Sequence, residues 1–233
     1  NDGVVIWNSG AAFQGGESAS FLNRGLFEAQ ASTTLTTYSP SARNTFINAG
    51  TLRSTNGATL TIGSTALASQ GGTFEAAVDS SIAYLGGFAQ FENGTRFTGA
   101  GTHVFSNDAR FAGTITIANV TFAGGTQTGG GGSSGSIALL LGPLAWTGGN
   151  LQGNWEIAAG SVVDVSGPGT KRQTGGSIVN NGSFVWDSAV AFQGGNGATF
   201  TNNGLFEART STQLAYLGAG ARNGFTNSAS GTV

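Results

Sequence analysis

The chain has 233 residues, of which 9% are charged and 41 are glycine, whereas an average globular protein has about 25% charged residues and about 7% glycine. An apolar share of 39% with 16 phenylalanines excludes a disordered chain, and a net charge of −2 argues against a nucleic-acid partner. Because cysteine is absent and His103 is the single histidine, we expect no disulfide, no metal site and no cofactor.

Short alternating apolar stretches, separated by Gly or Asn turns, follow one another along the chain and predict β-strands. A unit of the form Phe-x-Asn-x-Gly-x-Leu/Phe occurs at residues 21–27 and 46–52. Looser versions follow at 71–75, 91–97 and 113–117. The range 124–150, which contains four consecutive glycines, is expected to be an irregular Gly-rich excursion. The unit then returns at 178–184 and 200–206.

A second, longer repeat contains these units. Residues 1–48 align without a gap on residues 180–227, and 25 of the 48 positions are identical. We call these segments the first copy and the second copy. Residues 1–179 therefore form one super-repeat, and residues 180–233 begin another.

The asparagines of the unit are regularly spaced. Asn23 and Asn48 belong to the first copy, and Asn180, Asn202 and Asn227 repeat the same rhythm in the second. We expect their side chains to form hydrogen-bonded ladders between successive coils, and their backbones to take the left-handed conformation of a sharp corner. The glycines two places later are expected to turn with positive φ and to leave room for the neighbouring coil. They are Gly25, Gly50, Gly182 and Gly204.

Strands and turns with this period predict an all-β fold, a parallel β-helix or β-solenoid with coils of about 22–25 residues. Residues 1–233 would form one continuous solenoid. Neither end carries a clear capping element, so we expect continuation in a longer chain or stacking on another subunit.

The repeated units resemble the arrays of large secreted bacterial β-solenoid proteins, such as filamentous-haemagglutinin-type adhesins and autotransporter passengers. The resemblance covers most of the chain except about 124–150. It implies a right-handed parallel β-helix, an extracellular or cell-surface location and a role in adhesion or in a surface layer. It supplies no catalytic residues.

Several polar residues are candidates for sites, but structural roles are favoured for them. Glu28, Glu75 and Glu207 occupy equivalent positions and are expected to face solvent along one face, with Arg43 pairing with Glu28. The densest polar cluster joins Asp164 to Lys171 and Arg172 across a Gly-Pro-Gly turn, which predicts an ion pair.

These observations leave three hypotheses about function. The leading one is a structural segment of an extracellular bacterial fibre or stalk that associates through its ends and is not an enzyme; no membrane span is expected, since the longest apolar run is residues 137–141. The alternative is an adhesin domain that binds carbohydrate or a cell surface through Trp146 and Trp155, if they face outward. A polysaccharide lyase or hydrolase would need a carboxylate cluster, for which the candidates are Asp164, Asp187 and Glu156.

Overall fold

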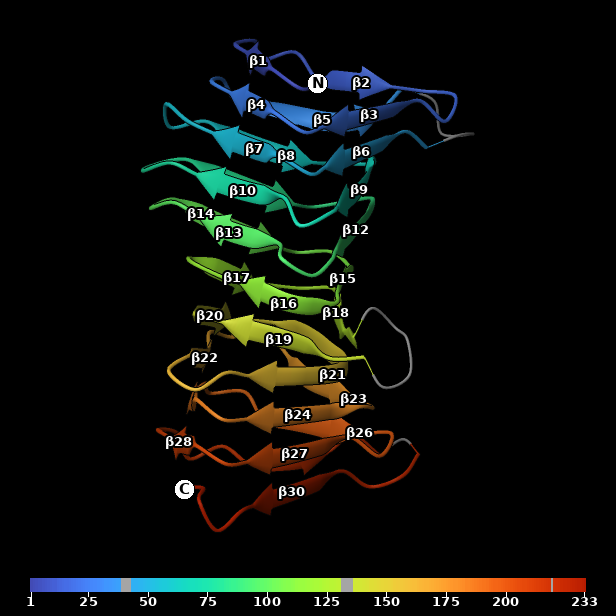
Figure 1. Ribbon diagram of the computed structural model, residues 1–233. Helices are drawn as coiled ribbons and strands as arrows, with labels where there is room; N and C mark the ends of the chain where they lie inside the picture. The colour runs from blue at the N-terminus through green and yellow to red at the C-terminus, as the bar shows by residue number, and fades with distance from the viewer. Residues whose placement is uncertain (39–42, 131–135, 219) are drawn as a thin grey trace.

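The chain winds into a three-sided parallel β-solenoid of about ten turns, which confirms the predicted fold class. The computed structural model describes residues 1–38, 43–130, 136–218 and 220–233. Each turn contributes one strand to each of three faces, and every strand pairs in parallel with the strand one turn away. Figure 1 shows the turns stacked from the N-terminus to the C-terminus, with three columns of strands.

The strands of each face follow in order. Face 1 consists of β1 (Val4–Trp7), β4 (Leu26–Ala29), β7 (Thr51–Ser54), β10 (Thr73–Ala76), β13 (Arg96–Thr98), β16 (Gly113–Thr116), β19 (Ala138–Leu141), β24 (Ser177–Asn180), β27 (Thr199–Asn202) and β30 (Gly224–Asn227). Face 2 consists of β2 (Phe13–Gly15), β5 (Thr33–Thr37), β8 (Thr59–Ile62), β11 (Ser81–Tyr84), β14 (Thr102–Phe105), β17 (Val120–Phe122), β20 (Pro143–Trp146), β22 (Val162–Ser166), β25 (Ser183–Asp187) and β28 (Leu205–Ala208). Face 3 consists of β3 (Ser20–Asn23), β6 (Thr45–Asn48), β9 (Ala66–Ser69), β12 (Phe88–Phe91), β15 (Ala109–Phe111), β18 (Thr126–Gly129), β23 (Lys171–Thr174), β26 (Phe192–Gly195) and β29 (Leu214–Tyr216).

The long strand β21 (Gly149–Ile157) turns the corner between two faces. Its first half pairs with β18 and β23 on face 3, and its second half pairs with β19 and β24 on face 1. Strands β18, β19 and β20 also lie inside the range 124–150. The expectation of an irregular excursion there was wrong for these strands, because Gly-rich stretches can still pair when the neighbouring coils supply the hydrogen bonds; residues 131–135 lie outside the described part.

Alternating side chains build the core. Most strands place every second residue in the interior, as period-2 alternation predicts. Aromatic rings stack from turn to turn: the rings of Tyr84 and Phe105 lie 4.0 Å apart and nearly parallel, and those of Phe184 and Phe206 lie 5.5 Å apart. Such ring pairs each add about 0.5–1.5 kcal/mol to the stability gained from burial.

The super-repeat does not contain a whole number of turns. Strand β1 of the first copy lies on face 1, whereas its counterpart in the second copy, β25, lies on face 2. Strand β3 lies on face 3 next to β6, and its counterpart β27 lies on face 1 between β24 and β30 (Figure 1). One super-repeat therefore completes a series of full turns and then one further face, so identical sequence is displayed on successive faces of the rod.

Candidate functional site: asparagine ladders and open ends

Two asparagine ladders run along the corners of the solenoid, one in each copy. In the first, Asn1 Nδ2 donates to Asn23 Oδ1 at 2.8 Å, and Asn23 Nδ2 donates to Asn48 Oδ1 at 2.8 Å. In the second, the amide of Asn180 donates to that of Asn202 at 2.8 Å, and Asn202 donates to Asn227 at 2.7 Å. The same amides also donate to backbone carbonyls of the next turn. Each ladder therefore satisfies buried polar groups and ties successive turns together.

The backbone conformation of these corners differs from the expectation. None of the five ladder asparagines predicted from the sequence has a positive φ, nor do Gly25, Gly50, Gly182 and Gly204. The left-handed residues lie in other turns, for example Asn56 and Asn119. The prediction of left-handed corners at the ladders was therefore wrong, because the chain turns there in ordinary conformations.

The glycines beside the ladders are required because a larger residue would collide with the preceding turn. A Cβ atom on Gly50 would lie 2.2 Å from the carbonyl oxygen of Gly25, and one on Gly204 would lie 2.1 Å from that of Gly182. Both contacts are with backbone of the preceding turn, which a side-chain rotation cannot relieve. Glycine thus permits the close approach of two turns at the corner.

The three glutamates that we expected on one face of the solenoid lie on two different faces. Glu28 and Glu75 lie on face 1 and flank Arg53, whose guanidinium donates to Glu75 at 2.7 Å and to Glu28 at 3.5 Å. Glu207 lies on face 2, because the second copy is displaced by one face, and it pairs with Arg209. The predicted partner of Glu28, Arg43, was wrong, since the register places Arg53 directly opposite Glu28.

The predicted ion pair at Asp164 is also absent from the described residues. Lys171 is fully buried, and its ammonium donates to Ser188 Oγ at 3.0 Å and to the carbonyl oxygen of Gly167. Burial lowers the pKa of Lys171. Arg172 instead donates to Gln193 Oε1 on the next turn at 2.9 Å. Lys171 and Arg172 therefore each bond to the following turn, Lys171 bonds in addition to Gly167, and neither pairs with Asp164.

Trp146 and Trp155 do not form a binding platform. Their side chains are 0% and 2% exposed, and their indole nitrogens donate to the carbonyls of Gly148 and Gln152. The alternating pattern places both rings in the core, where burial of their aromatic surface stabilises the fold. The proposed glycan contact through these two residues was therefore wrong.

The carboxylates considered for hydrolysis are not gathered at one site. Asp164 and Asp187 lie on face 2, whereas Glu156 lies on face 1 and accepts a hydrogen bond from Asn181. Among the described residues, no group of three or more His, Asp or Glu side chains could hold a metal ion.

His103 is a buried core residue. It lies on β14 between Ile82 and Val120, its Nε2 is 3.0 Å from the carbonyl oxygen of Thr98, and its Nδ1 has no hydrogen-bond partner in the structure. Burial lowers the pKa of His103 to about 4, and the hydrogen bond to Thr98 opposes this shift. The imidazole is therefore neutral in the folded protein at neutral pH.

This pKa predicts a loss of stability in acid. The unfolded chain takes up the proton near pH 6.5, whereas the folded chain resists it until about pH 4, so protonation favours unfolding as the pH falls through this window. We expect the free energy of unfolding to drop by about 2.5 kcal/mol between pH 7 and pH 4.5. Urea titrations of the protein and of His103→Leu measure this, and the variant should lack that part of the drop. Equal acid sensitivity of the two proteins would contradict the prediction.

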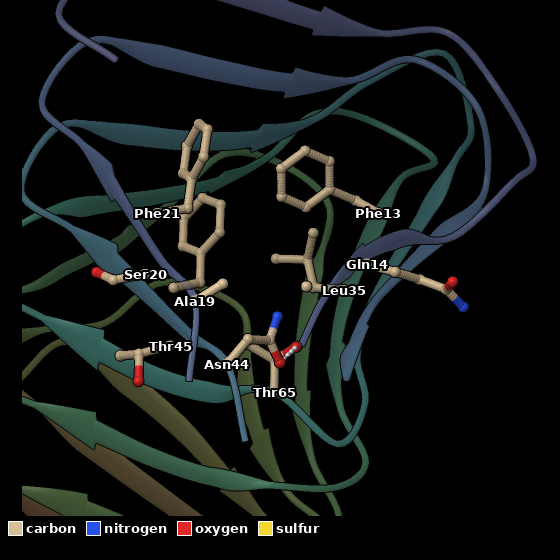
Figure 2. Close-up of a pocket in the computed structure, with 11 residues that line it drawn as sticks. Phe13, Gln14, Ala19, Ser20, Phe21, Leu35, Asn44, Thr45 and Thr65 are labelled. Carbon is tan, nitrogen blue, oxygen red and sulfur yellow. Dashed lines mark hydrogen bonds between the residues drawn. The ribbon is translucent and has the colours of Figure 1, made fainter. Parts of the chain in front are cut away.

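An apolar opening to the core lies at the N-terminal end. A cavity of about 160 Å³ is lined by the apolar side chains of Phe13, Phe21 and Leu35 and by Asn44. Figure 2 shows these side chains around the cavity, with Gln14 pointing away from it. Asn44 fits against β2 because Gly15 has no side chain; a Cβ there would lie 2.8 Å from Asn44 Nδ2.

The second copy contains the same cavity in a nearly filled form. Its lining includes Phe192, Phe200, Leu214 and Asn223, the counterparts of the residues above, and its volume is only about 20 Å³. Gln173 from the preceding turn also lines it. The cavity at the N-terminal end thus occupies a core position that the preceding turn covers in the second copy.

Both ends of the described solenoid expose strand edges and apolar side chains. The N-terminal end face, which we define as β1, β2 and β3, pairs on one side only and exposes Val4 (65%) and Ile6 (56%). The C-terminal end face, defined as β28, β29 and β30, exposes Leu214, Tyr216 and Phe225. Unpaired edges of this kind are templates for further strand pairing.

Comparison with protein-family models, with curated proteins and with solved structures finds no match. In the part of the chain that the structure describes, no helix has the length and apolar character of a membrane span. The ladders, Arg53 and the two end faces are the features of this solenoid that bear on its function. The sequence pattern did not identify Gln173 or Arg53 as functional residues. The strand register places Arg53 opposite Glu28 and Glu75, and the offset between the copies relates the surroundings of Gln173 to the N-terminal cavity.

Proposed function

We propose that the chain is a structural segment of an extracellular bacterial surface fibre or stalk, extended turn by turn through its two end faces. The single observation that carries this proposal is that each end presents unpaired strand edges together with exposed apolar side chains. Pairing of these edges with a further turn would bury that surface and satisfy the backbone groups.

Further support comes from the interior of the rod. Hydrophobic stacking, the amide ladders and the two ion pairs of Arg53, with Glu28 and with Glu75, all act between neighbouring turns. Each added turn can therefore gain the same kinds of contact. The extracellular bacterial location rests on the resemblance of the repeat units to secreted surface proteins. We propose no catalytic role. The hypothesis of adhesion to glycans has no remaining candidate residues, because Trp146 and Trp155 are buried.

A charged substitution at the C-terminal end face should reduce end-to-end association. Phe225 is 38% exposed and stacks on Phe200, with ring centroids 5.4 Å apart. Phe225→Lys places an ammonium group where the next turn must pack, and burying an unpaired charge costs several kcal/mol. We expect the association constant from sedimentation velocity to fall by at least about tenfold.

The matched control is Val78→Lys. Val78 is 66% exposed and lies in a turn in the middle of the rod, so this variant adds the same charge away from both ends. It should associate like the original protein. If Phe225→Lys and Val78→Lys associated equally strongly, the C-terminal end face would not be the surface through which the chains associate.

A further inference from the structure

We infer that the N-terminal end face is a binding surface for a β-coil with the sequence of residues 158–179, and that Lys171, Arg172 and Gln173 of this coil are its recognition residues. The inference rests on the proposed function and names the partner of one end. Its basis is that the structure contains the same end face twice, once open in the first copy and once covered in the second.

The covered version shows which turn fits. In the second copy, β25, β26 and β27 are the counterparts of β1, β2 and β3, and they are covered by β22, β23 and β24. Phe192 pairs with Lys171, and Phe200 pairs with Ile178. The counterparts of these two phenylalanines, Phe13 and Phe21, line the open cavity at the N-terminal end.

Three consecutive side chains of β23 contact the turn below. Lys171 Nζ donates to Ser188 Oγ at 3.0 Å, Arg172 Nε donates to Gln193 Oε1 at 2.9 Å, and Gln173 Nε2 donates to the carbonyl oxygen of Thr199 at 2.8 Å. These contacts reach the interior, the outer surface and the corner of the coil, so together they fix its register.

The open end face retains the acceptors for all three contacts. Ser9 and Gln14 are identical to Ser188 and Gln193, and the third acceptor is a main-chain carbonyl, which Ser20 also provides. Ser9 Oγ accepts a hydrogen bond from the amide of Ala11, as Ser188 Oγ does from that of Val190. The local conformation that receives the lysine is therefore already formed.

Asn1 shows how such a coil would join. Its side chain donates to Asn23 as that of Asn180 donates to Asn202, so Asn1 already occupies the position that ends the covering turn in the second copy. A coil of the 158–179 type placed directly before Asn1 would lead into Asn1 as residues 158–179 lead into Asn180, without a change of register. By contrast, the C-terminal end face carries Leu214, Ala215 and Tyr216 at the positions of Lys171, Arg172 and Gln173 and lacks the three donors.

The test is the full chain with residues 158–179 added ahead of Asn1, compared with the original chain by hydrogen exchange. We expect the amides of β1 and β2 to exchange at least about tenfold more slowly in the extended protein. The same extension with its lysine, arginine and glutamine replaced by alanine should leave these amides as fast as in the original chain. Unchanged protection of β10 to β16 verifies folding in all three proteins.

Two results would overturn the inference. One is fast exchange in β1 and β2 despite the intact extension; the other is equal protection by the alanine extension, which would mean that the end face accepts any coil. Both are separable from a failure of the proposed function, because the extension can dock specifically even if the original chain never forms fibres, and fibres can form without selecting this coil.

Discussion

Replacing Gly50 by alanine should destabilise the protein by about 3–4 kcal/mol. The added Cβ would lie 2.2 Å from the carbonyl oxygen of Gly25 and 2.5 Å from the backbone of Arg24, so two turns must separate at the corner where the asparagine ladder runs. The expected separation would also lengthen the hydrogen bond between Asn23 and Asn48. Chemical denaturation of the variant and the original protein measures the effect.

Gly10→Ala is the control for this substitution. Gly10 has no positive φ, and the nearest atom to a Cβ there is 3.8 Å away, so an alanine fits without movement. Its effect should stay within about 0.5 kcal/mol. If Gly50→Ala proved as mild as Gly10→Ala, close approach of the turns would not be the reason for glycine in the repeated unit.

Asn180→Ala should cost about 3–5 kcal/mol. The amide of Asn180 donates to Asn202 Oδ1 and to the carbonyl oxygen of Leu205, and its Oδ1 accepts from the backbone amide of Gly182. Alanine leaves these three partners without their bonds in a buried corner, and each such group costs about 1–3 kcal/mol. The free energy of unfolding from urea titration reports the loss.

The neighbouring asparagine provides the comparison. Asn203 is only partly buried and makes one side-chain hydrogen bond, to Asn181 Oδ1 at 2.9 Å. Asn203→Ala should therefore cost about 1 kcal/mol or less. Similar costs for the two substitutions would show that the ladder contributes no more than a surface hydrogen bond.

The fold was predictable because the period of the sequence matches the period of the structure. Asn180 lies opposite Asn202, and Asn202 lies opposite Asn227, so the spacing of the asparagines equals the register offset between β24, β27 and β30. Turns in the middle of the chain are shorter, as the pairing of Phe105 with Phe122 shows. There the repeated unit is degraded, so the pattern gives no firm boundaries, and the strands β18, β19 and β20 were not expected within the range 124–150.

The assignment of residues to faces could not be predicted from the repeat alone. The two copies are separated by the same number of residues whether the second copy begins on the face where the first began or on the next face. Which case holds depends on the number of strands, and β21 turns a corner at Gly153 within one continuous strand. For this reason the sequence groups Glu207 with Glu28 and Glu75, although it lies on another face.

The failures at individual sites have a related cause. Trp146 and Trp155 alternate with small and polar residues, so a shift of one residue in the assumed register reverses inside and outside. The pattern did not identify Arg53 as the partner of Glu28, because the turn that brings them together, from β4 to β7, is longer than the turn from β1 to β4.

Electron cryo-microscopy of the concentrated protein tests the central claim, that the turns stack into a rod that grows through its end faces. We expect filaments in which an axial spacing of about 4.8 Å continues without interruption across the junctions between chains. Isolated particles of single-chain length at every concentration, or filaments joined through the sides of the solenoid, would contradict it.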